Sequence, residues 1–423
     1  MNTFTRTLEA RIGPAVTAIV SGGLAGLIAI LTLQLMMAAQ HLIWNTAAPE
    51  GGAGPVRIAV TILIGGGLLI LLAKISPSET VSELLDSTDH PLARSNRKIL
   101  LTALAATVAV GFGGAIGPEA GLLAVIMECS AIVGRKIARS EEQARAIAHA
   151  GVAGALGGLY ASPPAAAAMD GPDDGVPASR LMSFIAGISG FLVFVFVAKA
   201  AFNGEGTFSI PLPDSKPGED WLIIVPVLVG GILGVLFRVL QAGADRVAAW
   251  IARPWLVTLI GTALFAALAA AIPLVRFSGH EQLHDVDHLF DQGAAAQLWL
   301  LAFAKIVAVV LCLSSGWRGG EIFPLIFVGA AAGSATALLL PDLDPAAAFA
   351  GALAATITVG WRRPLAALLL LLLLIDLSVL VPVLVGVGAG IALDRLVFPE
   401  AQGRGEATRD DTKDPETTPR TSM

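Results

Sequence analysis

The residues most able to do chemistry in this sequence lie in a short glycine-rich run that holds a single carboxylate. Residues 111–125 read GFGGAIGPEAGLLAV, and Glu119 is flanked on both sides by glycine, alanine and aliphatic residues. Placing an ionisable side chain in apolar surroundings is costly, so such a residue marks a functional position by default. The alternative is that Glu119 only favours a helix N-terminus or packs as a satisfied polar group.

The residues around Glu119 predict a helix that begins inside the protein. Pro118 suits the first turn, where its missing N–H costs nothing. The amides of Glu119, Ala120 and Gly121 are then free donors, and the helix dipole adds partial positive charge beside them. Because such a helix end binds anions, we predict an anion site at Gly117 and these three residues.

A second glycine-rich run has the same spacing about 200 residues later in the chain. The segment GAIGPE at 114–119 matches GWRGGE at 316–321 with an offset of 202. Further on, AGVAGALGGLYASPP, which ends at Pro164, matches AGALAATITVGWRRP at 350–364 with an offset of 200. Coincidence of composition is the alternative. Two matches in the same order favour an internal repeat, which transporters often use with inverted topology.

The repeat predicts a second helix start that faces the first. In that half Gly320, Glu321 and Ile322 supply the corresponding amides, so two helix ends enclose a site for a small anion near the membrane midplane. Glu119 is then a tethered anion. Deprotonated, it occupies and blocks the site; protonated, it leaves and admits a mobile anion.

The composition indicates that helices spanning a membrane carry these residues. Of 423 residues, 55% are hydrophobic and 14% charged, and the mean hydropathy is +0.76. These values lie outside the usage of soluble proteins. A membrane helix needs about 20 apolar residues, so we expect an all-α integral membrane protein in a lipid bilayer. The candidate stretches are 15–39, 56–73, 99–116, 181–202, 222–240, 255–275, 297–313 and 364–397, the last long enough to cross nearly twice.

The chain is expected to form one membrane unit, residues 14–398, with repeat halves at 14–202 and 221–398. The polar, charged tail at 399–423 cannot bury apolar surface and is expected to be disordered. The N-terminal segment 1–13 is expected to be cytoplasmic, because basic residues concentrate on that side of a membrane. We therefore expect a multi-pass protein of the inner cell membrane.

Three stretches of the chain resemble the CLC chloride channel and transporter family. IGPEAG at 116–121 resembles the GREGP motif, and LCLSSGWRGGEIFP at 311–324 resembles the GGxFxP motif and the segment before it. Residues 350–377 resemble the alanine-rich helix, proline break and acidic-capped helix that follow. The resemblance covers about residues 15–397. It implies tilted, broken helices in two inverted halves, a homodimer, no cofactor, and one pathway per subunit that binds chloride as its substrate.

Carried over residue by residue, the resemblance places the gating glutamate at Glu119 and the amides that hold the central anion at Glu321 and Ile322. Ser78 in ISPSETVSEL falls on a pathway serine, with an ordinary helix N-cap as the alternative. Asp173 falls near the internal proton-transfer glutamate of exchanging members. Its surroundings, DGPDDG, disfavour the continued helix found there.

The chain departs from the family pattern in several places. Pro118 stands where GREGP has a basic residue, and Ala120 and Gly121 replace its Gly-Pro. Glu321 adds a carboxylate where the family usually has an apolar side chain, so its charge must point away from the anion or be neutralised. The pathway tyrosine near the C-terminal end is missing, and the only tyrosine is Tyr160, in the first half.

Several more polar residues carry weaker predictions. His280, His284 and His288 recur every fourth residue, a spacing that suits metal ligands or proton acceptors; a solvated loop helix is the favoured interpretation. Lys305, within an apolar stretch, is expected to pair with a carbonyl or carboxylate or to reach the interface. Cys129 and Cys312 are expected to be inert. No enzyme motif and no basic nucleic-acid-binding run occurs, so neither an enzyme nor a nucleic-acid partner is expected.

The sequence therefore predicts transmembrane transport of chloride or a similar small inorganic anion, gated by Glu119. A passive channel and a proton-coupled exchanger both remain open. A membrane scaffold that has lost transport is a rival hypothesis, as is a secondary transporter whose broken helices bind an organic anion.

Overall fold

The computed structural model describes residues 3–45, 54–74, 99–138, 140–170, 177–206, 208–216, 218, 220–251 and 253–399. In these ranges the chain is almost entirely helical, and the one isolated β-bridge joins Gly117 to Gly320. The all-α prediction is therefore confirmed. Ser78 and Asp173 lie outside the described residues, as does the tail after residue 399.

The helices of the first half are α1 (Thr3–Trp44), α2 (Pro55–Ala73), α4 (Ile99–Gly111), α5 (Glu119–Ile137), α6 (Glu141–Leu159), α7 (Pro163–Asp170) and α8 (Pro177–Phe202). The second half contains the turn η3 (Asp220–Ile223), α9 (Ile224–Ile251), α10 (Pro254–Ala271), the turn η4 (Pro273–Val275), α11 (Leu283–Asp291), α12 (Ala295–Ser314), α13 (Ile322–Leu339), α14 (Pro345–Trp361), α15 (Pro364–Leu374), the turn η5 (Leu377–Val379) and α16 (Leu380–Val397).

Within the described residues, eight helices are long and apolar enough to cross a bilayer, which confirms a membrane protein. Two of the predicted crossings were wrong in extent. The stretch 99–116 forms only the 13-residue α4, and 364–397 divides into the 11-residue α15 and the longer α16. At 1.5 Å per residue α15 reaches only about halfway across the hydrocarbon core. It ends because Asp376 accepts a hydrogen bond from the Ser378 amide and begins a new turn.

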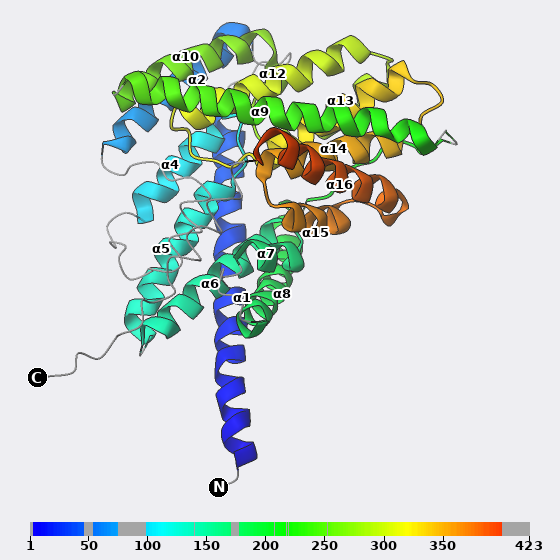
Figure 1. Cartoon of the computed structure of the whole chain (residues 1–423). Coiled ribbons are helices and arrows are strands. Elements are labelled where there is room, and N and C mark those ends of the chain that lie inside the picture. Colours follow the sequence, from blue (N-terminus) through cyan, green and yellow to red (C-terminus); the bar gives the residue numbers. More distant parts are fainter. Residues whose placement is uncertain are drawn as a thin grey trace, which may run out of the picture.

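The two halves repeat the same order of elements around a break. In the first half α6 ends at Leu159, the left-handed residue Ala161 (φ 50°) follows, and α7 begins at Pro163. In the second half α14 ends at Trp361, the left-handed residue Arg362 (φ 61°) follows, and α15 begins at Pro364. Figure 1 shows the short helices α7 and α15 next to each other where the teal helices of the first half meet the orange helices of the second.

Glycine allows helices within each half to approach closely. At the crossing of α1, α6 and α8, a Cβ on Gly154 would overlap the backbone of Gly22, and a Cβ on Gly190 would overlap that of Gly154. In the second half, a Cβ on Gly386 of α16 would meet the carbonyl of Gly351 on α14. Small residues at such crossings let backbones pack directly, the usual basis of helix association in membranes.

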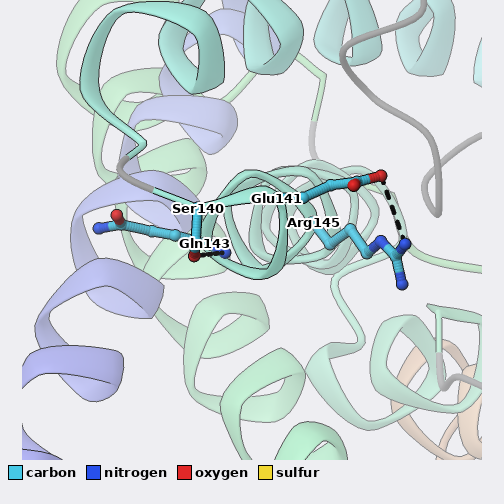
Figure 2. Close-up of polar contacts among 4 residues, drawn as sticks. All are labelled: Ser140, Glu141, Gln143 and Arg145. Carbon is cyan, nitrogen blue, oxygen red and sulfur yellow. Dashed lines mark hydrogen bonds and ion pairs between the residues drawn. The ribbon is translucent and has the colours of Figure 1, made fainter.

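The start of α6 is fixed by its first turn, as Figure 2 shows. The Ser140 hydroxyl accepts a hydrogen bond from the Gln143 amide at 3.2 Å, and Arg145 pairs with Glu141 at 3.4 Å. The cap satisfies an amide that has no helical partner, whereas the exposed ion pair contributes little. A defined start sets the register of α6, whose far end carries Tyr160.

Candidate functional site

The two glycine-rich loops meet inside the protein and pair through their backbones. The Gly117 amide donates to the Gly320 carbonyl at 2.8 Å, and the Gly320 amide donates to the Gly117 carbonyl at 3.0 Å. The pairing is antiparallel, as expected for two loops of opposite direction. Because Gly117 precedes α5 and Gly320 precedes α13, the N-termini of the two helices lie at one place.

Each of the two helix starts leaves amides without a helical acceptor. In α5 the first intrahelical bond runs from Leu122 to the Pro118 carbonyl, and in α13 it runs from Leu325 to the Glu321 carbonyl. The amides before them therefore face the meeting point with the positive ends of two helix dipoles. They belong to Glu119, Ala120 and Gly121 in α5 and to Glu321, Ile322 and Phe323 around the start of α13. Pro324 has no amide, so Phe323 is a position that the sequence reasoning missed.

The Glu119 side chain lies between the two paired loops. It is fully buried, and a Cβ added to Gly117 or Gly320 would overlap its carboxylate. The amides of Gly320 and Phe323 act on that carboxylate. Even so, neither carboxylate oxygen has a partner with hydrogen-bond geometry among the described residues. A buried carboxylate that lacks hydrogen-bond donors is energetically costly. Protonation of Glu119, or movement of its side chain out of this position, relieves that cost.

Tyr160 is the functional candidate that the sequence reasoning did not place at the site. It caps the C-terminal end of α6, is fully buried, and its hydroxyl has no hydrogen-bond partner in the described part of the chain. Its ring lies 5.9 Å from that of Phe323 and 6.5 Å from that of Trp361. The carboxylates of Glu119 and Glu321 both act electrostatically on its hydroxyl. Two features of the sequence could have identified it: it is the only tyrosine in the chain, and it lies inside one of the repeated segments.

The extra carboxylate of the second loop has a positive group near it. Glu321 is half-buried at the N-cap of α13, and Arg363 is the cation that acts on it. Arg363 precedes α15 and donates from Nη1 to the Met169 carbonyl of α7 at 2.6 Å. The charge of Glu321 is therefore partly balanced from the break in the second half, one of the two outcomes expected for it.

Bulky buried side chains hold the two loops in place. Ile116 is fully buried against Gly319, where a Cβ would overlap it. Trp317 packs edge-on to Phe265 at 5.6 Å and donates from Nε1 to the Thr262 hydroxyl at 3.1 Å. The loops are thus anchored to α10, which limits their freedom to separate.

A cavity of about 150 Å³ adjoins the first loop. Its walls include Ile116 and Pro118 from that loop and Phe208, Phe277 and His280 from elsewhere in the chain. The His280 ring meets Phe208 edge-on at 4.5 Å, and burial lowers the pKa of His280 to about 4. The imidazole is therefore neutral at physiological pH. The cavity reaches Pro118, the residue next to Glu119 in the chain.

Lys305 fixes the wall of this cavity. Its ammonium is fully buried and donates to three consecutive carbonyls, those of Val275 (3.1 Å), Arg276 (3.2 Å) and Phe277 (2.7 Å). The predicted carbonyl pairing of Lys305 is thereby confirmed. It ties α12 to the segment after η4.

The three spaced histidines do not form one cluster. His280 precedes α11 in a loop, whereas His288 on α11 hydrogen-bonds Gln292 at 2.9 Å. Among the described residues no group of three or more His, Cys, Asp or Glu side chains is placed to hold a metal. Cys129 and Cys312 are free thiols.

Comparisons with known proteins place this geometry in a family context. The profile described as "Voltage gated chloride channel" matches residues 79–395. The chain is 24% identical to chloride channel protein CLC-f of Arabidopsis thaliana over 328 residues, 69% of this chain and 41% of that protein. It is 24% identical to the putative ion-transport protein YfeO of Salmonella choleraesuis over 339 residues, 75% of this chain and 78% of that protein. The chain thus spans less than half the length of the plant relative.

Two solved structures have the same fold. A slow cyanobacterial Cl⁻/H⁺ antiporter superposes with a TM-score of 0.74 at 18% identity, covering 95% of this chain and 99% of that one. A CLC-type fluoride/proton antiporter superposes with a TM-score of 0.66 at 18% identity, covering 92% and 96%. At such low identity the likeness establishes the fold alone.

Proposed function

The chain belongs to the voltage-gated chloride channel (CLC) family, and from this premise we propose that it moves chloride or a similar small inorganic anion across a membrane. The pathway runs through the meeting point of α5 and α13, and Glu119 is its gate. Gly117, Ala120, Gly121, Gly320, Glu321 and Ile322 surround the anion through their backbones.

The observation that carries the proposal is the unpaired Glu119 carboxylate between the two paired glycine loops. Each helix start contributes about half a positive charge, so this place attracts a negative group. The ionised carboxylate is such a group and excludes a free anion by occupying the space. On protonation its attraction to the helix ends falls, the side chain swings away, and a mobile anion takes its place.

Several parts of the proposal concern residues and partners beyond the described geometry. Ser78 adds a hydroxyl to the pathway, and Asp173 accepts protons at its inner side. The protein is a homodimer in the inner membrane with its N-terminus in the cytoplasm, and its role is transport rather than catalysis of a reaction. Repeat halves at 14–202 and 221–398 each supply one side of the anion site.

One observation favours exchange with protons over passive conduction. The two solved structures of the same fold are by name Cl⁻/H⁺ and fluoride/proton antiporters. A passive channel gated by the same carboxylate stays the alternative, since protonation opens the site in both cases.

The proposal is tested with purified protein in liposomes loaded in turn with chloride, fluoride and nitrate. Anion efflux and external pH are recorded for the wild type, Glu119→Gln and Glu119→Ala. Glu141→Gln is the matched control, because this acid lies in the exposed first turn of α6 with a side chain 61% accessible. We expect efflux with proton counterflow in the wild type and the control, and loss of the proton movement in both Glu119 variants.

Each remaining outcome is equally decisive. Efflux without any pH change in the wild type indicates a passive channel. Absence of inorganic anion flux from the wild type contradicts the proposal and favours the scaffold or an organic-anion transporter. Efflux and proton movement that are unchanged in Glu119→Ala exclude this residue as the gate.

A further inference from the structure

We propose that the Tyr160 hydroxyl is a further ligand of the anion site and donates its hydrogen bond to the transported ion when that ion lies between α5 and α13. With the Glu119 carboxylate in that place, neither group has a hydrogen-bond partner among the described residues. The inference rests on the proposed function and adds a second side-chain hydroxyl, beside the one proposed at Ser78, to a site lined by backbone amides.

The first support is the condition of the hydroxyl itself. Tyr160 is fully buried, and its oxygen has no partner in the described residues. Buried tyrosine hydroxyls normally find one inside the protein, because an unmade bond at low dielectric is unfavourable. A buried hydroxyl without a hydrogen-bond partner is therefore unusual. Because Glu119 and Glu321 act on this hydroxyl, we infer that its partner is a ligand that occupies the site only part of the time.

The second support is where the charged groups around Tyr160 come from. Those that act on its hydroxyl are Glu119 from the start of α5, Glu321 from the loop before α13 and Arg363 from the break before α15. Each belongs to one of the elements that converge on the site. The hydroxyl is therefore within electrostatic reach of the gate.

The third support is the packing of the ring. It lies between Phe323, whose amide acts on the Glu119 carboxylate, and Trp361 at the end of α14. Both neighbours are buried, with 2% and 7% of their surfaces exposed. Packing on two sides holds the phenol in one orientation, so little freedom is lost when it binds an anion.

The chemistry of a phenol suits a transport site. Its O–H donates one hydrogen bond to a halide or a carboxylate, and bonds to ions are stronger than those between neutral groups. A phenol brings no charge, so it aids binding without trapping the ion as a buried cation would. Tyr160 thereby stabilises the mobile ion when that ion replaces the tethered carboxylate.

The test compares the full-length wild type with Tyr160→Phe, which keeps the ring and removes only the oxygen. Chloride and fluoride affinities are measured by titration calorimetry on the purified protein in detergent, and unfolding temperatures are recorded beside them. We expect anion affinity to fall about ten-fold or more, while the unfolding temperature stays the same or rises.

A matched control is available on α14. Thr358 also has a buried hydroxyl without a partner in the described residues, but it packs against Gly390 of α16. Thr358→Val removes that oxygen and is expected to leave anion affinity unchanged.

Failure of this inference and failure of the proposed function give different results. A wild type that binds neither anion overturns the proposed function and this assignment with it. Wild-type binding that Tyr160→Phe leaves unaltered overturns the assignment alone. An affinity loss matched by Thr358→Val, or accompanied by a lower unfolding temperature, shows a structural role and also overturns it.

Discussion

Tyr160 and Trp361 lie at corresponding helix ends in the two halves of the chain, and their rings meet at 6.5 Å with an interplanar angle of 65°. Each directly precedes a left-handed residue, and a proline that begins the next helix follows. Gly117 and Gly320 likewise come from corresponding loops and pair with each other. Contacts between corresponding loops and helix ends place the candidate site where the two halves meet, so both halves must be folded before it exists.

Trp361→Ala should weaken the protein because it removes one wall of the Tyr160 ring. The indole is 7% exposed, and truncating a buried aromatic side chain costs about 3–5 kcal/mol. We expect a lower unfolding temperature in detergent, together with reduced anion flux because the phenol loses its orientation. Trp250→Ala is the control, since that side chain is 85% exposed. Equal stability losses in the two variants would show that Trp361 packing is unimportant.

Lys305→Met should destabilise the segment that follows η4. The substitution keeps an apolar stem of similar length but leaves the carbonyls of Val275, Arg276 and Phe277 without their shared donor. Because buried acceptors without donors are costly, we expect the free energy of unfolding to fall by about 2 kcal/mol or more. Chemical unfolding of both proteins measures it, with Lys199→Met on the exposed face of α8 as control. A variant as stable as the control contradicts the structural role given to this lysine.

The buried imidazole of His280 should make stability depend on pH. Its pKa is lowered to about 4 in the folded protein, chiefly by burial, from the ordinary value of 6.5. As pH falls below 6.5 the unfolded state takes up a proton first, so the free energy of unfolding decreases until pH 4 and changes little below that. The decrease reaches about 2 kcal/mol at pH 5.

His280→Phe checks this dependence, because a phenyl ring can keep the edge contact with Phe208. Unfolding temperatures between pH 4 and 7.5 should fall less steeply with acid in this variant than in the wild type. His284→Phe removes an exposed imidazole of α11 and should retain the wild-type slope. Identical slopes in wild type and His280→Phe would mean that another group titrates.

The helix starts of the site could be predicted from sequence because their signals are local. Gly117 lies directly before Pro118, and Gly320 lies a few residues before Pro324; both glycines break an apolar run. A proline in the first turn then favours the start of a new helix. The predicted start at Glu119 agrees with the structure, whereas α13 begins at Ile322, the last of the three residues predicted to supply amides there. The short length of α15 was missed, because its run of leucines has no internal break before the cap at Asp376.

What could not be predicted depends on contacts between distant residues. The repeat offset aligns Gly117 with Gly319, yet the backbone pair forms with Gly320. Tyr160 gains its surroundings from Phe323 and Trp361, residues of the other half. The sequence around Tyr160 contains no pattern that indicates either of these neighbours. The sequence could predict that Lys305 pairs with a buried acceptor, because a buried ammonium must find one. It could not predict which carbonyls these are.

Gly320→Ala tests whether the Glu119 carboxylate fills the space between the loops. The backbone of Gly320 is not left-handed, so alanine is conformationally acceptable there. Its methyl group would overlap the Glu119 carboxylate and approach the Cβ of that residue. Crowding of a packed interior costs about 1–3 kcal/mol, so we expect Gly320→Ala to be destabilising on its own.

In the background of Glu119→Ala the same methyl group finds room, so most of that loss should disappear. The double variant is then more stable than the two single effects predict, with a coupling of about 1 kcal/mol or more, as for residues in direct contact. Gly388→Ala on α16, which meets nothing within 4 Å, should combine additively with Glu119→Ala. Additive behaviour of Gly320→Ala as well would place the carboxylate elsewhere, and the blocking role of Glu119 would then lack its structural basis.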